Sequence, residues 1–462
     1  MNPQELEIRR RVLALIKQHG WNTTSFQILE PGFRYWVDGD DACVGYVDTG
    51  SAWVVAGAPI APPERIADVV AKFCAAAAAQ QRRVCCFGTE SRFQEIVKWS
   101  GLRIGDQPVW APREWDDVVR KSKSLREQLR RARAKGVIVR ALEVDELASG
   151  HPIRAQLDQL IARWLATKEI APMGFVVQLD PFSFPDEKRY FAAMRDNEIV
   201  GMLAVIPIYA RDGWFFEDFL RDPSAPNGTT ELLIDAAMRA AAAANVAHVT
   251  LGLAPLAGDV SPWLRLARRW GRALYDFEGL RAFKSKLKPR EWDPVYLSYP
   301  SGKSGTLAVI DTLTAFARGG LLRFGIKTLL RGPSIVVRGL AALLVAWTVL
   351  LALPLSARWF PSPAWQWGWV GFDVVLGVAL FSLAKRWRHD LATLVAGLVT
   401  ADAITTAAEA VFYNAPRVRT LADMIVIAIA VLAPTQAAVL LWHARAHRQV
   451  LDQPSRSPPA IA

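Results

Sequence analysis

"GWFFEDFLRDPSAPNGTTELLIDAAMRAAAAA", residues 213–244, carries the strongest fold signal in the chain. An aromatic run with strand character leads into Pro226-Asn227-Gly228, which predicts a turn, and an alanine-rich helix is expected from Thr229. Thr229 or Thr230 could serve as the N-cap, with Glu231 in the first helical turn. A strand, a turn and a helix in this order are typical of an α/β fold.

The same order of elements occurs twice before residue 300. Each copy has two strand patterns, then a helix, then another strand, at 42–50, 51–59, 63–81 and 83–89 and again at 198–210, 213–220, 229–244 and 246–256. We therefore expect two α/β domains, the first at 1–112 and the second at 113–300. The segment 105–115, "GDQPVWAPREW", is expected to link them.

Two acids and an arginine close the aromatic strand. Adjacent strand residues point to opposite faces, so only one of Glu217 and Asp218 is expected to face a given cleft. Arg221 follows them, just before the predicted helix. Glu231 is either part of the same charged group or only a stabiliser of the helix N-terminus.

Three lysines alternate with other residues near the end of the second domain. If this segment is extended, Lys284, Lys286 and Lys288 would line one face. A basic strand edge that prevents aggregation is the alternative interpretation.

A basic run, "RKSKSLREQLRRARAK", occupies residues 120–135. At helical spacing Lys123, Arg126, Arg130 and Arg133 share one side. Such a stripe attracts phosphates of RNA and of acidic lipid headgroups alike. A merely solvated helix face remains the alternative.

Beyond Gly339 the chain is largely apolar, with charges confined to short clusters. Four segments are near the roughly 20 residues that a helix needs to cross the hydrocarbon of a bilayer. We expect an all-α bundle of four transmembrane helices within 339–443, at Gly339–Ala357, Trp365–Ala384, Leu391–Tyr413 and Leu421–Trp442. A basic amphipathic juxtamembrane linker is expected at 301–338, and a disordered cytoplasmic tail at 444–462.

Basic residues flank these segments mainly on one side. The positive-inside rule therefore predicts a multi-pass protein of the inner membrane with both termini, and the whole N-terminal half, in the cytoplasm. Acidic residues within the segments serve either helix packing or the handling of lipid. They are Asp373, Asp402, Glu409 and Asp423.

The residue types favour anionic partners and no metal. The formal net charge is +11, which suits nucleic acid or acidic lipid. The six histidines show no metal-ligand spacing. The four cysteines form no C-x-x-C pair, which fits a reduced compartment. We expect no metal and no cofactor.

Five spaced strings bear on the family. They are LREQLRRARAKGV (125–137), RWLATKEIAPMGF (163–175), PNGTTELLI (226–234), LGLAPLAG (251–258) and GLRAFKSKLKP (279–289). In this order they resemble the C-terminal catalytic domain of the bacterial lysylphosphatidylglycerol synthetases, the aminoacyl-phosphatidylglycerol synthases, over about residues 25–300. The resemblance implies tandem acetyltransferase-like (GNAT) folds. It also implies transfer of an aminoacyl group from aminoacyl-tRNA to a lipid hydroxyl, usually that of phosphatidylglycerol.

Site residues are expected among the charged side chains described above. The catalytic candidates are Asp218, Glu217, Arg221, Glu231 and Lys286. The substrate-binding candidates are Asn227, Gly228, Lys284, Tyr296, Arg126, Arg130 and Arg133. Asp218 or Glu217 would bind the donor's α-ammonium group and a second carboxylate would pair with a basic side chain, with Glu231 a candidate for either task. Arg221 and Lys284 or Lys286 would hold phosphates of the tRNA end or of the lipid headgroup.

The chain departs from the family in one respect, and two other functions remain open. The family's membrane segments precede the catalytic domain, whereas here they follow it, which leaves the acceptor lipid and any flipping of lipid undecided. An acyl-CoA-dependent N-acyltransferase is the second hypothesis, because Arg268, Gly271 and Ala273 match a pyrophosphate-binding loop by letters, although in an unsuitable helical context. A non-catalytic GNAT-like membrane scaffold is the third. The transferred amino acid and the oligomeric state are not predicted.

Overall fold

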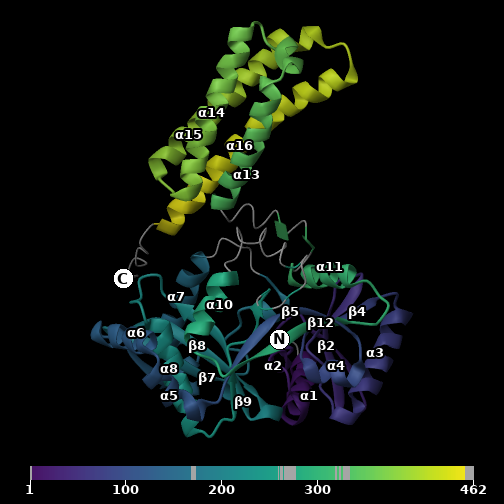
Figure 1. Ribbon diagram of the computed structural model, residues 1–462, viewed down its shortest axis with the longest axis vertical. Helices are drawn as coiled ribbons and strands as arrows, with labels where there is room; N and C mark the ends of the chain where they lie inside the picture. Colours follow the sequence, from purple (N-terminus) through teal and green to yellow (C-terminus); the bar gives the residue numbers. More distant parts are fainter. Residues whose placement is uncertain are drawn as a thin grey trace. The chain divides into compact units, whose positions relative to one another are not determined.

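The structure is a computed structural model that describes residues 3–167, 173–256, 258, 260, 264, 277–317, 320–321, 324–325 and 333–452. These residues form two compact units (Figure 1). The first contains the described residues up to Leu165 and those from Met173 to Phe324, and the second contains the helices from Pro333 onward. The two are described separately below.

The first unit is built on one 12-stranded mixed sheet. Its strands, in the order of the sheet, are β1 (Arg34–Asp38), β2 (Ala42–Asp48), β3 (Ala52–Ala56), β4 (Arg83–Thr89), β12 (Glu291–Tyr299), β5 (Ser100–Trp110), β10 (His248–Thr250), β9 (Gly213–Arg221), β8 (Glu198–Ile208), β7 (Arg189–Arg195) and β6 (Ile138–Leu142), while β11 (Ala254–Pro255) pairs with β5 beside this path.

The sheet repeats one arrangement in its two halves. In the first half, β2 and β3 are antiparallel, and the helix α3 (Ile66–Ala79) leads to β4, which runs parallel to β3. In the second half, β8 and β9 are antiparallel, and α8 (Thr229–Ala243) leads to β10, parallel to β9. The predicted strand, strand, helix, strand order is confirmed in both.

The two halves share strands, which the sequence did not predict. β12 comes from the second half of the chain but lies between β4 and β5 of the first half, and β5 in turn pairs with β10. The expected linker 105–115 is therefore wrong in its first part, since residues 105–110 are the buried end of β5. Asp106 is paired there, because Arg103 donates to it at 2.6 and 2.9 Å.

Helices cover both faces of the sheet. Side chains alternate along β8, so that Leu203 and Val205 pack beneath α8, whereas Ala204 and Ile206 point to the opposite side. We call these the α8 face and the α7 face. The α8 face carries α3, α4 (Ser91–Val97), α5 (Trp115–Lys121), α6 (Lys123–Ala134), α8 and α10 (Phe277–Lys286), and the α7 face carries α1 (Pro3–His19), α2 (Thr24–Gln27), α7 (Pro152–Ala166), the 3-10 turn η4 (Phe175–Val177) and α11 (Gly305–Phe316).

The second unit is helical. It contains α13 (Pro333–Ala352), α14 (Pro363–Lys385), α15 (His389–Glu409) and α16 (Leu421–Asp452). Three stretches in the described part are long and apolar enough to cross a membrane: Pro363–Lys385, His389–Arg417 and Leu421–Ala446. The first of the four expected segments, Gly339–Ala357, corresponds to the shorter apolar helix Val336–Ala352, followed by a 3-10 turn at Pro354–Trp359. Beyond residue 443, α16 continues as a helix to Asp452.

The acidic residues of this unit are mostly tied to neighbours within it. Arg358 pairs with Asp423 at 3.0 Å, and Trp369 donates to Glu409 at 3.2 Å. Asp402 accepts from Thr406 at 3.0 Å. Asp373 is buried, and its Oδ2 has no hydrogen-bond partner among the described residues. Asp423 and Glu409 are thus paired with residues of other elements, and Asp402 with a residue of its own helix.

Candidate functional site

Glu217 and Asp218 lie on the same face of the sheet. Val205 of β8 pairs with Phe216, but the next residue, Ala204, pairs with Asp218, so Glu217 is the extra residue of a β-bulge. A bulge interrupts the alternation of side chains along a strand. Both carboxylates therefore point to the α7 face, and the expectation that only one of them can face a given cleft is wrong.

A third carboxylate joins them from the first half of the chain. Glu30, which follows α2, is only 4% exposed, and its Oε2 has no hydrogen-bond partner in the described part of the chain. Gln27 of α2 donates to Glu217 at 2.7 Å and to the carbonyl oxygen of Val176 at 2.9 Å. We call Glu30, Glu217 and Asp218 the carboxylate cluster.

One lysine accompanies these three acids. Lys188 is buried at the start of β7, but its amine donates to the carbonyl oxygen of Asp180 at 3.1 Å and to Ser183 at 3.2 Å. It therefore opposes the negative charge without forming a direct ion pair with the cluster. The described residues include no group of three His, Cys, Asp or Glu side chains arranged to hold a metal ion.

The cluster is short of positive charge. Burial raises the pKa of Glu30 to about 10, repulsion from Glu217 adds to this, and Lys188 opposes it. Burial raises the pKa of Glu217, and burial with repulsion from Glu217 raises that of Asp218. With this pKa, Glu30 retains its proton at neutral pH until a cation arrives. The arrangement is suited to binding an ammonium group.

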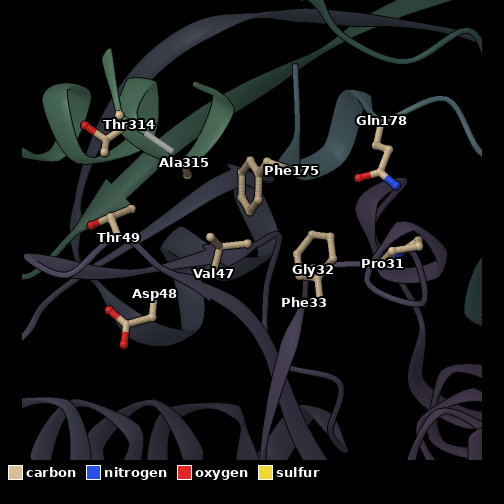
Figure 2. A pocket seen from close by; sticks show the side chains of 11 residues that line it. Pro31, Gly32, Phe33, Val47, Asp48, Thr49, Phe175, Gln178, Thr314 and Ala315 are labelled. Atoms are coloured by element: carbon tan, nitrogen blue, oxygen red, sulfur yellow. The ribbon is translucent and has the colours of Figure 1, made fainter. Parts of the chain in front are cut away.

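A cavity of about 370 Å³ lies on the same face, beside η4 (Figure 2). Its apolar wall includes Phe33, Phe175 and Ala315, with ring centroids of Phe33 and Phe175 5.5 Å apart. Gln178 also lines it, and its Oε1 has no partner among the residues described. Because η4 contributes Phe175 to the cavity and the Val176 carbonyl to Gln27, one short turn connects the cavity to the carboxylate cluster.

The other candidates near β9 lie on the α8 face. Arg221 pairs with Gly201 of β8, so the two residues point to the same face of the sheet. A Cβ on Gly201 would contact Leu233 and Thr229 of α8. Arg221 donates to the carbonyl oxygen of Ala225 at 2.6 Å and to Asn227 at 3.3 Å, which holds the turn in shape. The structure thus separates Arg221 and Asn227 from the carboxylate cluster by the thickness of the sheet.

The start of α8 is made by Gly228, not by a threonine cap. Gly228 has φ +95 and is the N-cap, and a Cβ there would collide with the backbone oxygen of Gln128 in α6. Thr229 instead donates to the Pro226 carbonyl at 2.7 Å. Glu231 is half-buried in the first turn, and none of the described residues forms a hydrogen bond or ion pair with it.

The three lysines do not line one face, because the segment is helical. Phe277–Lys286 forms α10, and Lys288 follows in a left-handed conformation, φ +52. Lys284 is buried and donates to the carbonyl oxygens of 251–253 at 2.8 to 3.0 Å, whereas Lys286 is exposed. Burial lowers the pKa of Lys284 to about 7, although three carbonyl acceptors favour its protonated form.

Tyr296 lies in β12, within the first half of the sheet. Its carbonyl oxygen accepts from Thr89 at 3.2 Å, next to a register shift in β12. The fold thus places Tyr296 beside β4, away from the β9–β8 strands that carry Glu217 and Asp218.

The predicted basic stripe is present on α6. Lys123, Arg126, Arg130 and Arg133 all line one groove of about 680 Å³. Several of these charges are already compensated: Arg130 pairs with Glu127 at 2.8 Å, and Arg133 pairs with Asp235 of α8 at 2.9 Å. The helix is also fixed, because Arg126 donates to the Val119 carbonyl at 3.2 Å.

Comparisons with known proteins agree with the resemblance found in the sequence. The family described as "Phosphatidylglycerol lysyltransferase, C-terminal" matches residues 13–299. The lysylphosphatidylglycerol biosynthesis bifunctional protein LysX of Nocardia farcinica is 28% identical over 247 residues, 49% of this chain and 21% of that protein. The phosphatidylglycerol lysyltransferase of Bacillus subtilis is 30% identical over 159 residues, 32% of this chain and 18% of that protein. The chain thus spans about a fifth of the length of these relatives.

Solved structures show the same fold. The L-PGS structure from Bacillus licheniformis has a TM-score of 0.58 at 19% identity and covers 66% of this chain and 96% of that one. A C-terminal domain from Agrobacterium fabrum has a TM-score of 0.59 at 20% identity and covers 69% of this chain and all of that one. These likenesses confirm the α/β fold of the first unit.

Proposed function

Because this chain belongs to the phosphatidylglycerol lysyltransferase C-terminal family, we propose that it transfers an aminoacyl group from aminoacyl-tRNA to a hydroxyl of phosphatidylglycerol. Two relatives are named for lysylphosphatidylglycerol synthesis or for lysyl transfer to phosphatidylglycerol. The membrane-length helices that follow the first unit support an acceptor in a bilayer. The flanking basic residues favour the inner membrane as its location, with the first unit in the cytoplasm.

The carboxylate cluster is the observation that carries this proposal. The donor's aminoacyl group bears an α-ammonium, and Glu217 and Asp218 are partly buried acids on one face of the sheet. With Glu30 they provide three carboxyl groups against one nearby lysine. An incoming ammonium group would be attracted because it supplies the missing charge.

The reaction itself makes modest demands on the protein. The lipid hydroxyl oxygen attacks the ester carbonyl carbon, the bond from that carbon to the ribose oxygen of the tRNA breaks, and the hydroxyl proton passes to the released ribose oxygen. Because the ester is already activated, orientation of the two reactants supplies much of the acceleration. Binding of the α-ammonium by Glu217 and Asp218 would fix one end of the donor.

The tRNA phosphates are assigned to the α8 face. Arg221 and Asn227 sit at the start of α8, and α6 packs against α8 with Arg126, Arg130 and Arg133 along its groove. Phosphate contacts there would hold the tRNA independently of sequence at a distance from its aminoacylated end, which has to reach the carboxylate cluster on the α7 face. Lys286 is exposed on the same face and could make a further phosphate contact. The amine of Lys284 already donates to three carbonyl oxygens, so we assign it a structural role.

The decisive experiment uses the full chain in liposomes. With aminoacyl-tRNA and phosphatidylglycerol, labelled lipid should form, and ribonuclease treatment of the donor should abolish it. Glu217→Gln and Asp218→Asn should each reduce transfer at least tenfold. Asp158→Asn is the matched control, since Asp158 is an exposed acid on α7, paired with Arg154 at 3.0 Å.

Other outcomes would favour the alternatives. Lipid modification that requires an acyl-CoA and survives ribonuclease would support the N-acyltransferase hypothesis, whose residues Arg268, Gly271 and Ala273 lie outside the described residues. No lipid product with any donor would support a non-catalytic scaffold. Full activity in both carboxylate variants would contradict the site assignment.

A further inference from the structure

Part of the expected juxtamembrane linker is a helix fixed to the sheet. α11 begins at Ser304, whose hydroxyl accepts from the Leu307 amide at 3.4 Å. Asp311 is buried and pairs with Arg83 of β4 at 2.6 and 2.8 Å, and Ser51 donates to it at 3.0 Å. These contacts make α11 part of the first unit, so its orientation on the α7 face is set.

α11 exposes three large apolar side chains. A surface helix of a soluble protein buries its large apolar side chains and exposes its polar ones. In α11 the fully buried side chains are small or polar, namely Ala308, Asp311, Thr312 and Ala315, and Val309 and Phe316 are partly buried. The other large side chains are exposed: Leu307 at 41%, Ile310 at 44% and Leu313 at 50%. We call these three residues the α11 apolar face.

The sequence segment that contains this helix is basic. Between residues 301 and 338 the sequence contains six basic residues, Lys303, Arg318, Arg323, Lys327, Arg331 and Arg338, and one acid, Asp311. That acid is already neutralised by Arg83. A helix with leucine and isoleucine outward, within a basic segment, has the two properties that bind an anionic lipid surface: apolar side chains for the headgroup boundary and positive charge for the phosphates.

The chain itself also leads from this helix to the membrane. Phe316 ends α11, and Pro333 begins the helices of the second unit, three of which can cross a bilayer. The cavity on the α7 face is lined in part by Thr314 and Ala315 of α11 (Figure 2). A lipid next to the α11 apolar face would therefore be next to the cavity that η4 joins to the carboxylate cluster.

We propose that the α11 apolar face rests on the surface of an anionic phospholipid bilayer and seats the first unit there. The seating presents the cavity beside α11 to the lipids, which deepens the proposed function by locating the side from which the acceptor arrives. The docking surface itself does not require that the chain be a transferase.

A fluorescent label tests the contact without any activity. Ile310→Cys is labelled with an environment-sensitive dye in the full chain in liposomes, in a Cys74→Ala background because the other cysteines are buried. With vesicles that contain phosphatidylglycerol, the emission should shift to the blue, and brominated lipid should quench it by at least half. The control is Ile138→Cys, at an exposed position on β6 (65% exposed), which should remain unquenched.

Two results would overturn the proposal. One is a label at 310 that stays in water with anionic vesicles. The other is a label that is shielded without quenching by brominated lipid and cross-links to a second copy, which would make the face a dimer contact. If the wild-type chain transfers nothing to lipid but the label is quenched, the docking surface stands and the proposed function fails.

Activity provides a second readout if transfer is observed. The double variant Ile310→Glu with Leu313→Glu should lose at least fivefold in transfer to phosphatidylglycerol in vesicles. Transfer to a short-chain phosphatidylglycerol dissolved in water should be unchanged, because no bilayer is needed to present it. Ile138→Glu should leave both rates at the wild-type level. Equal losses with both acceptors would show folding damage and contradict the docking role.

Discussion

Glutamine in place of Glu30 should stabilise the first unit at neutral pH and weaken donor binding. Burial raises the pKa of Glu30 from 4.5 to about 10, so the folded protein holds a proton there that the unfolded chain releases above pH 4.5. The stability that this group contributes is fully present below pH 4.5 and is lost as the pH rises toward 10.

The magnitude follows from that difference. Between pH 4.5 and pH 7.5 the free energy of unfolding of the wild type falls by about 1.4 kcal/mol per pH unit, or roughly 4 kcal/mol in total. Glutamine cannot ionise, so the variant does not lose this free energy as the pH rises. Its buried amide N–H without an acceptor costs roughly 1–3 kcal/mol. The net gain of about 1–3 kcal/mol corresponds to an apparent unfolding temperature higher by roughly 2–6 °C.

Function should change in the opposite direction. Glutamine cannot supply the negative charge that an ammonium group attracts, so the KM for aminoacyl-tRNA should rise at least tenfold while kcat changes less. In the wild type, donor binding displaces the proton on Glu30, so the KM should fall as the pH rises from 6 to about 7.5, while the donor's α-ammonium is still protonated. This pH dependence should be weaker in Glu30→Gln.

The assay is thermal unfolding of the full chain in detergent from pH 5 to pH 8, followed by initial rates with labelled donor. The unfolding temperature of the wild type should fall across this range relative to that of the variant, and the two curves should cross between about pH 5 and pH 7, because the unpaired amide costs roughly 1–3 kcal/mol at every pH. Glu64→Gln, at an exposed position, is the control and should follow the wild type. Parallel pH curves for wild type and Glu30→Gln, with equal donor KM values, would refute the reasoning.

Three further changes test other parts of the structure. Gly228→Ala should lower the free energy of unfolding by roughly 2–4 kcal/mol, because Gly228 has a left-handed φ and a Cβ there would collide with the Gln128 oxygen. Gly136 also has a left-handed φ but has no neighbour at the Cβ position, so Gly136→Ala should cost only about 1–2 kcal/mol in the same melting assay. Lys284→Met should lower the unfolding temperature by leaving carbonyl acceptors unpaired, whereas Lys286→Met should leave it unchanged, and the reverse ranking would contradict the structural role. Arg130→Ala should raise the donor KM and flatten its dependence on salt, measured between 50 and 300 mM NaCl, and an unchanged salt slope would remove α6 from the RNA-binding surface.

The repeated α/β order could be predicted because its signals are local. Aromatic and β-branched runs, the Pro226-Asn227-Gly228 turn and the alanine-rich helix each fit within about 15 residues, and no distant partner is needed to recognise them. The same holds for the basic stripe of α6, whose four cations share a groove as helical spacing predicts. Local periodicity therefore accounts for most of the elements.

The site could be predicted only in part, because its geometry depends on pairing between distant segments. The bulge that turns Glu217 and Asp218 to one face is a register shift in the pairing of β9 with β8. The residue types of β9 alone do not predict this shift. Glu30 is 187 positions before Glu217 in the chain, although a charged residue among the apolar "FQIL" letters is a signal of a buried acid. Lysines at 284 and 286 looked extended by alternation, but packing of Phe283 and Leu287 favours a helix there.

The position of β12 determines when the sheet can be completed during synthesis of the chain. β4 and β5 are made early, but the strand that separates them in the sheet ends at Tyr299, about 200 residues later. Until then each presents an unsatisfied edge to which other chains could pair. The apolar helices follow only from Pro333. The closing strand thus leaves the ribosome before the helices that are long and apolar enough to cross a membrane, so the sheet can be completed before those helices emerge.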